Sequence, residues 1–271
     1  MDTWLRENRQ QYQMFVGLVQ LLLNRQFSPL TTEPVSAQAF RTDHTEAVIR
    51  LLNSFSQDSI SSPLRVFSTG PLFGPASIWT DAIDVEWIGP VGAREEREVL
   101  NLIAEMVEWL GTYGMASEDL TMVYGHPGWL RQLGATVGLE LSQIQDLEDV
   151  LHRGRLSALE AILGSAPRAV YHLFRPQGPE AFFNYLNQYL SVSPAVIPSP
   201  PWQTRWDLSL VGKRSYYSGL VFNLYHRRTG QPLVTGGQFA LPDGGRYAAG
   251  IGFTLDMDAC RRASTEVMFV V

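Results

Sequence analysis

The chain has 271 residues, of which 45% are apolar, so it is long enough to bury a substantial core. Its formal net charge is −6, and Lys213 is its only lysine, which argues against a nucleic-acid partner because such a partner normally requires a basic stripe. The N-terminus is charged and polar, and no run approaches the roughly 18 apolar residues of a membrane span, so we expect a cytoplasmic protein without membrane contact.

The first predicted element is an amphipathic helix. Asp2 or Thr3 can cap its start, and the pattern ends near Asn24. Apolar residues recur at three- and four-residue spacing and predict one broad apolar face, made of Tyr12, Phe15, Val16, Val19, Leu22 and Leu23. This face is wider than packing on one small sheet requires.

Strands and two further helices are predicted before residue 112. "FSPLTTEP" is typical of a short extended segment that Pro34 closes, and "AFRTDHTEAVIRLLNSF" of a strand leading into a helix that starts between Thr42 and Thr45. "PLRVFSTGPLF" and "IDVEWIG" read as strands. "AREEREVLNLIAEMVEWLG" predicts an amphipathic helix with an apolar side of Val99, Leu102, Ile103, Met106 and Leu110.

The pattern changes between residues 120 and 192. A short strand, "LTMVYG", is followed by several short helices, and a stiff Pro-rich connector occupies residues 193–201. "RWDLSLVG", "YYSGLVFNLYH", "QPLVTGGQF" and "RYAAGIGFTLDMD" then predict consecutive strands of an antiparallel meander. We therefore expect an α+β fold: a single domain over residues 1–271, with an antiparallel sheet flanked by helices and a mainly helical insertion at about 120–192.

Metal and cofactor chemistry has no support in the residue spacing. Cys260 is the only cysteine, and no clustered Cys/His spacing offers a zinc site. "DGGRYAAGIG" lacks the phosphate-loop pattern GxxxxGK[ST]. It also lacks the GxGxxG motif between a strand and a helix that is typical of nucleotide binding. We expect no catalytic residues, no metal and no cofactor. The five scattered histidines are His44, His126, His152, His172 and His226.

Six segments in this order resemble the catalytic core of class II histidyl-tRNA synthetases and of their non-synthetase relative, the regulatory subunit of ATP phosphoribosyltransferase. They are "FRTDHT", "PLRVFSTGPLF", "DVEWIG", "YYSGLVFNLYH", "VTGGQF" and "AAGIGFTLDMD", and they span most of the chain. The resemblance implies a class II synthetase core that dimerises through the first helix and strand. No C-terminal anticodon-binding domain is expected.

Departures from the synthetase pattern favour the regulatory relative. Adenylate chemistry needs cations around the phosphates. The resemblance places arginines at Gly74 and Gly212, and the motif that ends in Glu-Arg in synthetases has Thr254 and Leu255 at those places. The sequence therefore predicts a chain without synthetase activity.

The resemblance also implies a retained amino-acid pocket. It places carboxylates at Asp43 and Glu86, with Tyr216 or Tyr217 as a wall; the implied histidine-binding residues are Asp43, Thr45, Glu86, Tyr216, Tyr217, Gly236 and Gly237. Two alternatives stay open at this point. Asp43 is equally suited to cap a helix, and Glu86 to be an exposed strand residue. Ala82 and the "GGQF" stretch depart from the family's histidine contacts.

The expected function is that of a non-catalytic regulatory subunit of ATP phosphoribosyltransferase in histidine biosynthesis. The resemblance implies a short-form catalytic subunit as partner, a homodimer within a hetero-oligomer, and histidine as a feedback ligand. Two alternatives remain. One is a truncated synthetase paralogue that activates an amino acid for a non-tRNA acceptor, and the other is a stand-alone amino-acid-sensing module.

Overall fold

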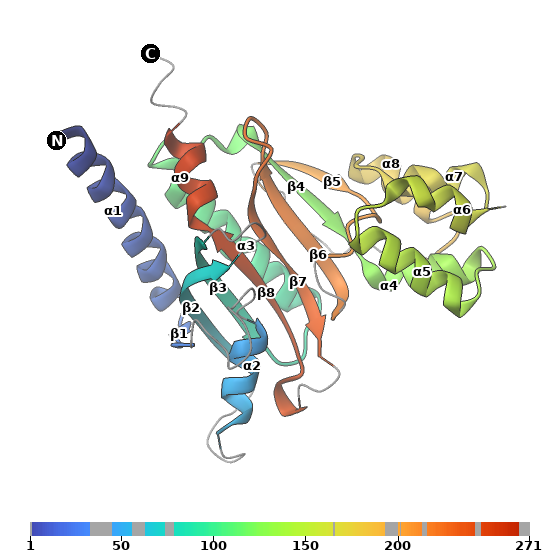
Figure 1. Ribbon diagram of the computed structural model, residues 1–271, viewed down its shortest axis with the longest axis horizontal. Coiled ribbons are helices and arrows are strands. Elements are labelled where there is room, and N and C mark those ends of the chain that lie inside the picture. The colour runs from blue at the N-terminus through green and yellow to red at the C-terminus, as the bar shows by residue number, and fades with distance from the viewer. Residues whose placement is uncertain are drawn as a thin grey trace.

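The computed structural model describes residues 2–32, 45–55, 63–73, 79–164, 166–192, 200, 202–212, 216–241 and 245–265. One sheet runs through the middle of the molecule (Figure 1). It has eight strands in the order β1-β2-β3-β8-β7-β6-β4-β5. The strands are β1 (Ser28–Pro29), β2 (Leu64–Phe73), β3 (Trp79–Ile88), β4 (Leu120–Gly125), β5 (Gln203–Trp206), β6 (Tyr217–His226), β7 (Pro232–Ala240) and β8 (Ala249–Asp256).

The α+β fold with a sheet flanked by helices is confirmed, and the sheet is antiparallel except at its two edges. The six inner strands pair antiparallel, and β6, β7 and β8 form the predicted meander. Both edge strands are parallel to their neighbours, β1 to β2 and β5 to β4. Each parallel pair is joined by a connection that contains a helix, which a parallel crossover needs and a short turn cannot provide.

The strand predicted from "RWDLSLVG" is shorter than expected. β5 ends at Trp206, and the Asp207 side chain then accepts a hydrogen bond from the backbone N–H of Ser209 at 2.8 Å. This local bond is typical of a turn, because it offers the backbone an alternative to the strand ladder. Residues 207–212 therefore follow the strand as a connecting segment that includes Gly212.

Helices cover both faces of the sheet. One face packs against α3 (Ala93–Gly111) and α9 (Met257–Thr265), and α1 (Asp2–Asn24) in turn packs on α3. On the other face, α2 (Thr45–Asn53) packs through Val48, Ile49 and Leu52 against Val66 and Ile88. The predicted apolar side of α3 is confirmed, since all five residues named for it are buried.

Among the described residues between β4 and β5, five α-helices form a group beside that edge of the sheet (Figure 1). We call this group the helical block. It contacts the sheet chiefly through the packing of α4 on β6. Its helices are α4 (Pro127–Thr136), α5 (Leu141–His152), α6 (Leu159–Leu163), α7 (Arg168–Tyr171) and α8 (Pro179–Leu186).

The first helix has two apolar faces rather than the single broad face predicted. Met14, Leu18 and Leu22 recur every four residues and are buried in the core. Tyr12 and Val16 lie on another face and are 70% and 44% exposed. The helix already includes Asp2 and Thr3, so these residues lie in its first turn rather than before it.

Candidate functional site

Two cavities lie on opposite faces of the sheet. The first, of about 750 Å³, lies on the face that carries α2 and is here called the sheet cavity. The second, of about 860 Å³, lies beside α3 and is here called the α3 cavity. Five of the seven residues predicted to bind a ligand line the sheet cavity, namely Thr45, Glu86, Tyr217, Gly236 and Gly237. The sheet cavity is therefore the candidate site.

The floor of the sheet cavity consists of alternate residues from adjacent strands. Thr80, Ala82 and Glu86 on β3 share one face because side chains alternate along a strand. Gly252, Thr254 and Asp256 on β8, together with Thr235 on β7 and Asn223 on β6, continue this floor. The opposite residues of the same strands, such as Ile83, Val85 and Leu255, are buried against the helices that carry the main core.

Glu86 is the central acidic group of the site. It is only 2% exposed, so the alternative that it is an exposed strand residue is wrong. The hydroxyl of Thr45, at the start of α2, donates a hydrogen bond to its Oε1. Gly252 pairs with Glu86 across the sheet, and a Cβ at that position would lie 1.9 Å from Oε2. A glycine at 252 is therefore necessary for the carboxylate to lie over β8 as it does.

The two tyrosines differ in their positions. Tyr217 lines the sheet cavity. Tyr216 does not line it, and its ring instead packs 5.1 Å from that of Tyr217 and 6.3 Å from that of Phe239. The hypothesis that Tyr216 contacts a ligand is therefore replaced by a supporting role, in which it fixes the wall that Tyr217 and Phe239 form.

Gly212 lines the sheet cavity at the end of the segment that follows β5. Its backbone φ of +80° is one that L side chains rarely adopt, and a Cβ would lie 2.2 Å from the ring of Tyr217. An arginine could not be placed here without moving Tyr217. His152, at the end of α5, lies with its Nδ1 3.1 Å from the Gly212 carbonyl oxygen, and this contact joins the helical block to the cavity wall.

Asp43, the second candidate carboxylate, and Gly74, one of the positions where synthetases have an arginine, lie outside the described residues. Leu255, by contrast, is described and is 1% exposed in the core on the other side of the sheet. It does not line the sheet cavity, so a ligand there is not within its reach. Thr254 faces the cavity instead.

Asp84 and Asp256 are acidic residues that the motif comparison missed. Asp84 is 1% exposed, and the hydroxyl of Thr254 donates a hydrogen bond to its Oδ1. Asp256 lines the cavity, accepts a hydrogen bond from the Ala259 N–H at 2.7 Å at the start of α9, and has a pKa raised by burial. The period-two alternation from residue 80 to residue 86 could have placed Asp84 beside Glu86.

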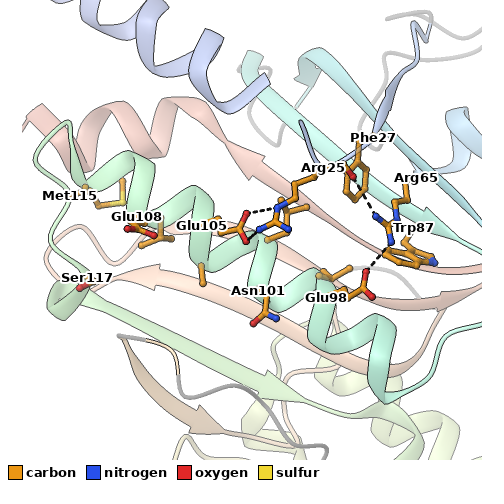
Figure 2. Close-up of a pocket in the computed structure, with 15 residues that line it drawn as sticks. Arg25, Phe27, Arg65, Trp87, Glu98, Asn101, Glu105, Glu108, Met115 and Ser117 are labelled. Carbon is orange, nitrogen blue, oxygen red and sulfur yellow. Dashed lines mark hydrogen bonds and ion pairs between the residues drawn. The ribbon is translucent and has the colours of Figure 1, made fainter. Parts of the chain in front are cut away.

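The α3 cavity has a different character, because its arginines are paired (Figure 2). Arg25 forms an ion pair with Glu105, and Arg65 forms one with Glu98 at 3.0 Å. The Arg65 guanidinium also lies 4.1 Å from the centre of the Trp87 ring. These cations are engaged by carboxylates of α3 and lie on the far side of the sheet from Glu86, so they do not contribute to the sheet cavity.

Within the described ranges, no group of three or more His, Cys, Asp or Glu residues is arranged to hold a metal ion. In the same part of the chain, no helix is both long enough and apolar enough to cross a membrane.

The fold and the sheet cavity define a protein like the catalytic core of a class II histidyl-tRNA synthetase. A family model described as histidyl-tRNA synthetase matches residues 35–260. The chain therefore belongs to the histidyl-tRNA synthetase family. Its fold is that of the class II catalytic core, and the resemblance inferred from the six segments is confirmed.

Among individual relatives, the ATP phosphoribosyltransferase regulatory subunit of Shouchella clausii is 27% identical over 282 residues, which cover 93% of this chain and 70% of that protein. Several other curated relatives have the same name. The chain spans 63% of the length of the regulatory subunit of Ectopseudomonas mendocina and 50% of the length of that of Aquifex aeolicus.

Solved structures agree on the fold. A crystal structure from Bacillus halodurans described as an ATP phosphoribosyltransferase regulatory subunit/histidyl-tRNA synthetase has a TM-score of 0.72 at 20% identity, covering 97% of this chain and 80% of that one. A chain of the ATP phosphoribosyl transferase (HisG:HisZ) complex from Thermotoga maritima has a TM-score of 0.62 at 14% identity, covering 91% of this chain and 97% of that one.

Proposed function

We propose that this chain is a non-catalytic regulatory subunit of ATP phosphoribosyltransferase that acts in the cytoplasm in histidine biosynthesis. The observation that carries the proposal is the sheet cavity: it keeps the buried Glu86 carboxylate, and the charged residues of its described lining are acidic. Adenylate formation needs cations at the phosphates, so this lining is suited to binding a ligand and poorly suited to activating one.

The names of the relatives support a catalytic partner for this chain. Proteins 23–27% identical to this chain have the name of the regulatory subunit, and one structural neighbour is a chain of the HisG:HisZ complex. We propose that this chain binds a short-form catalytic subunit and is required for the activity of that subunit. The chain then supplies assembly and control, and the partner supplies the phosphoribosyl transfer.

Self-association is the second part of the proposal. α1 has one apolar face in the core and a second one at Tyr12, Val16 and Leu23, which are 70%, 44% and 42% exposed. A helix whose apolar residues extend beyond the core face gains free energy by burying them against another surface. A second copy of the chain, related by a two-fold axis, would cover this face in each protomer.

Histidine is the proposed regulatory ligand of the sheet cavity. Its ammonium or imidazole N–H groups would be directed at Glu86, with its ring against Tyr217. A ligand that prefers one arrangement of the assembly shifts the population toward that arrangement. Asp43 is the second proposed carboxylate of the site.

The test is reconstitution with a short-form catalytic subunit. The rate of phosphoribosyl transfer from phosphoribosyl pyrophosphate to ATP should rise when this chain is added, and histidine should lower the rate of the assembled complex. Histidine-dependent exchange of pyrophosphate into ATP by this chain alone should stay at background. Exchange above background would support a synthetase paralogue, and absence of both a complex and rate activation would refute the regulatory proposal.

A further inference from the structure

One wall of the sheet cavity comes from outside the sheet. Leu151, in the last turn of α5, lines the cavity and is 6% exposed. The connecting segment after β5 contributes residues 209–212 to the same lining. A ligand on the floor of the sheet is therefore bounded in part by the helical block and in part by this connecting segment.

His152, the last residue of α5, joins these two parts of the wall. Its ring Nδ1 lies 3.1 Å from the carbonyl oxygen of Gly212. A carbonyl oxygen can only accept a hydrogen bond, so Nδ1 carries the hydrogen and donates it. The backbone of Gly212 is thereby held against the end of α5.

Gly212 is in direct contact with Tyr217. A Cβ on Gly212 would lie 2.2 Å from Cδ2 and 2.7 Å from Cε2 of the Tyr217 ring, so no methyl group fits between the backbone and the ring edge. The backbone of Gly212 therefore limits where this ring can lie. Because Tyr217 lines the sheet cavity, the position of its ring shapes the space for a ligand.

The helix that carries His152 is packed in place relative to the sheet. α5 packs on α4, and α4 packs on β6. A Cβ on Gly134 of α4 would lie 2.8 Å from Cγ1 of Ile144 on α5, so the two helices approach closely. Arg131 and Glu148 form an ion pair between the same helices, with Nε and Oε1 2.7 Å apart. The hydrogen bond to Gly212 therefore starts from a helix with a defined position.

We propose that His152 is a positioning residue of the sheet cavity: through the Gly212 carbonyl it holds the Tyr217 ring in place and thereby sets the affinity for the ligand. His152 is not among the described residues that line the cavity, so it acts from outside it. This inference rests on the proposed binding of histidine in the same cavity. It goes beyond that proposal by assigning part of the affinity to the helical block.

Fluorine NMR of the whole chain labelled with 3-fluorotyrosine tests the positioning step without any ligand. The resonance that disappears in Tyr217→Phe belongs to this ring. It should shift in His152→Ala and return to its wild-type position in His152→Asn, because the asparagine amide nitrogen lies as many bonds from Cα as Nδ1 of histidine and also donates. Arg153→Ala is the matched control at the same helix end: it removes an exposed ion pair with Asp149 and should leave the resonance in place.

Isothermal titration calorimetry with histidine tests the effect on binding. His152→Ala should weaken the binding of histidine about fivefold, the factor that corresponds to the loss of one net hydrogen bond, whereas His152→Asn and Arg153→Ala should stay within about twofold of wild type. If His152→Ala does not fold, His152→Gln takes its place. Its amide nitrogen lies one bond farther from Cα, so it should also shift the Tyr217 resonance and weaken the binding of histidine.

The outcomes are distinct. An unmoved Tyr217 resonance in His152→Ala would overturn the inference, and so would a moved resonance with unchanged affinity for histidine. An equal effect of Arg153→Ala, or no recovery in His152→Asn, would assign the change to the helix end as a whole and would also contradict it. If the wild-type chain does not bind histidine, the proposed ligand is refuted, and the fluorine resonance still decides whether His152 positions Tyr217.

Discussion

Replacing Glu86 with glutamine should remove most of the affinity for histidine without unfolding the chain. The glutamine side chain has nearly the same shape as glutamate, so it fits above Gly252. Its carbonyl oxygen can still accept a hydrogen bond from the Thr45 hydroxyl. What the change removes is the negative charge of a side chain that is 2% exposed. Hydrogen bonds to charged groups contribute about 1.5–3 kcal/mol, which corresponds to about a ten- to hundredfold weaker complex.

Calorimetric titration of histidine into the wild-type chain and Glu86→Gln measures this loss. Thermal unfolding should be within a few degrees of wild type, because no volume is lost and a buried charge is removed. In the complex with the catalytic subunit, the variant should relieve inhibition by histidine and leave the uninhibited rate nearly unchanged. Wild-type affinity in Glu86→Gln, with the fold intact, would refute the assignment of Glu86 to the ligand site.

The remaining predictions concern packing, assembly and pH. Gly252→Ala should weaken the binding of histidine at least as much as Glu86→Gln does, because the new methyl group displaces the Glu86 carboxylate. Unchanged binding by calorimetry would contradict this geometry. Tyr12→Ser combined with Val16→Ser should convert a dimer into a monomer in sedimentation velocity at micromolar concentration, with unfolding by urea little affected. Burial lowers the pKa of His126 from 6.5 to about 4. Between these values the unfolded chain binds a proton that the folded chain does not, so the free energy of unfolding is highest above pH 6.5 and falls as the pH drops toward 4. Between pH 7 and pH 5 the free energy of unfolding, measured with urea, should therefore fall by about 2 kcal/mol. His126→Asn should show a smaller fall, and an equal fall in this variant would assign the pH dependence to other groups.

Sequence patterns predicted the parts of the fold in which one side of an element is buried. The five apolar residues named for α3 follow a helical period and all face the core. The pattern was only partly right for α1: Phe15, Val19 and Leu22 of the predicted face contact the core, whereas Tyr12 and Val16 are exposed. Periodicity reports that side chains are apolar, and it does not report which of two apolar faces a core covers.

Strand direction was less predictable than strand position. The parallel pairing of β5 with β4 depends on how the helical block returns the chain to the sheet, and no local residue pattern records that path. In the site, five of the seven named residues share one cavity, whereas Tyr216 supports its wall and Asp43 lies outside the described residues. Motif comparison found positions that correspond to known ligand contacts and therefore missed Asp256.

The hydrogen bond between His152 and the Gly212 carbonyl links residues 60 positions apart, one on the helical block and one on the cavity wall. Gly212 lies against the Tyr217 ring, so a displacement of α5 is transmitted to the side chain that borders the ligand. Binding free energies coupled in this way are reciprocal. If a protein docked on α5 changes the affinity of the cavity for its ligand by some factor, an occupied cavity changes the affinity for that protein by the same factor. A small ligand thereby changes how tightly a whole subunit is held.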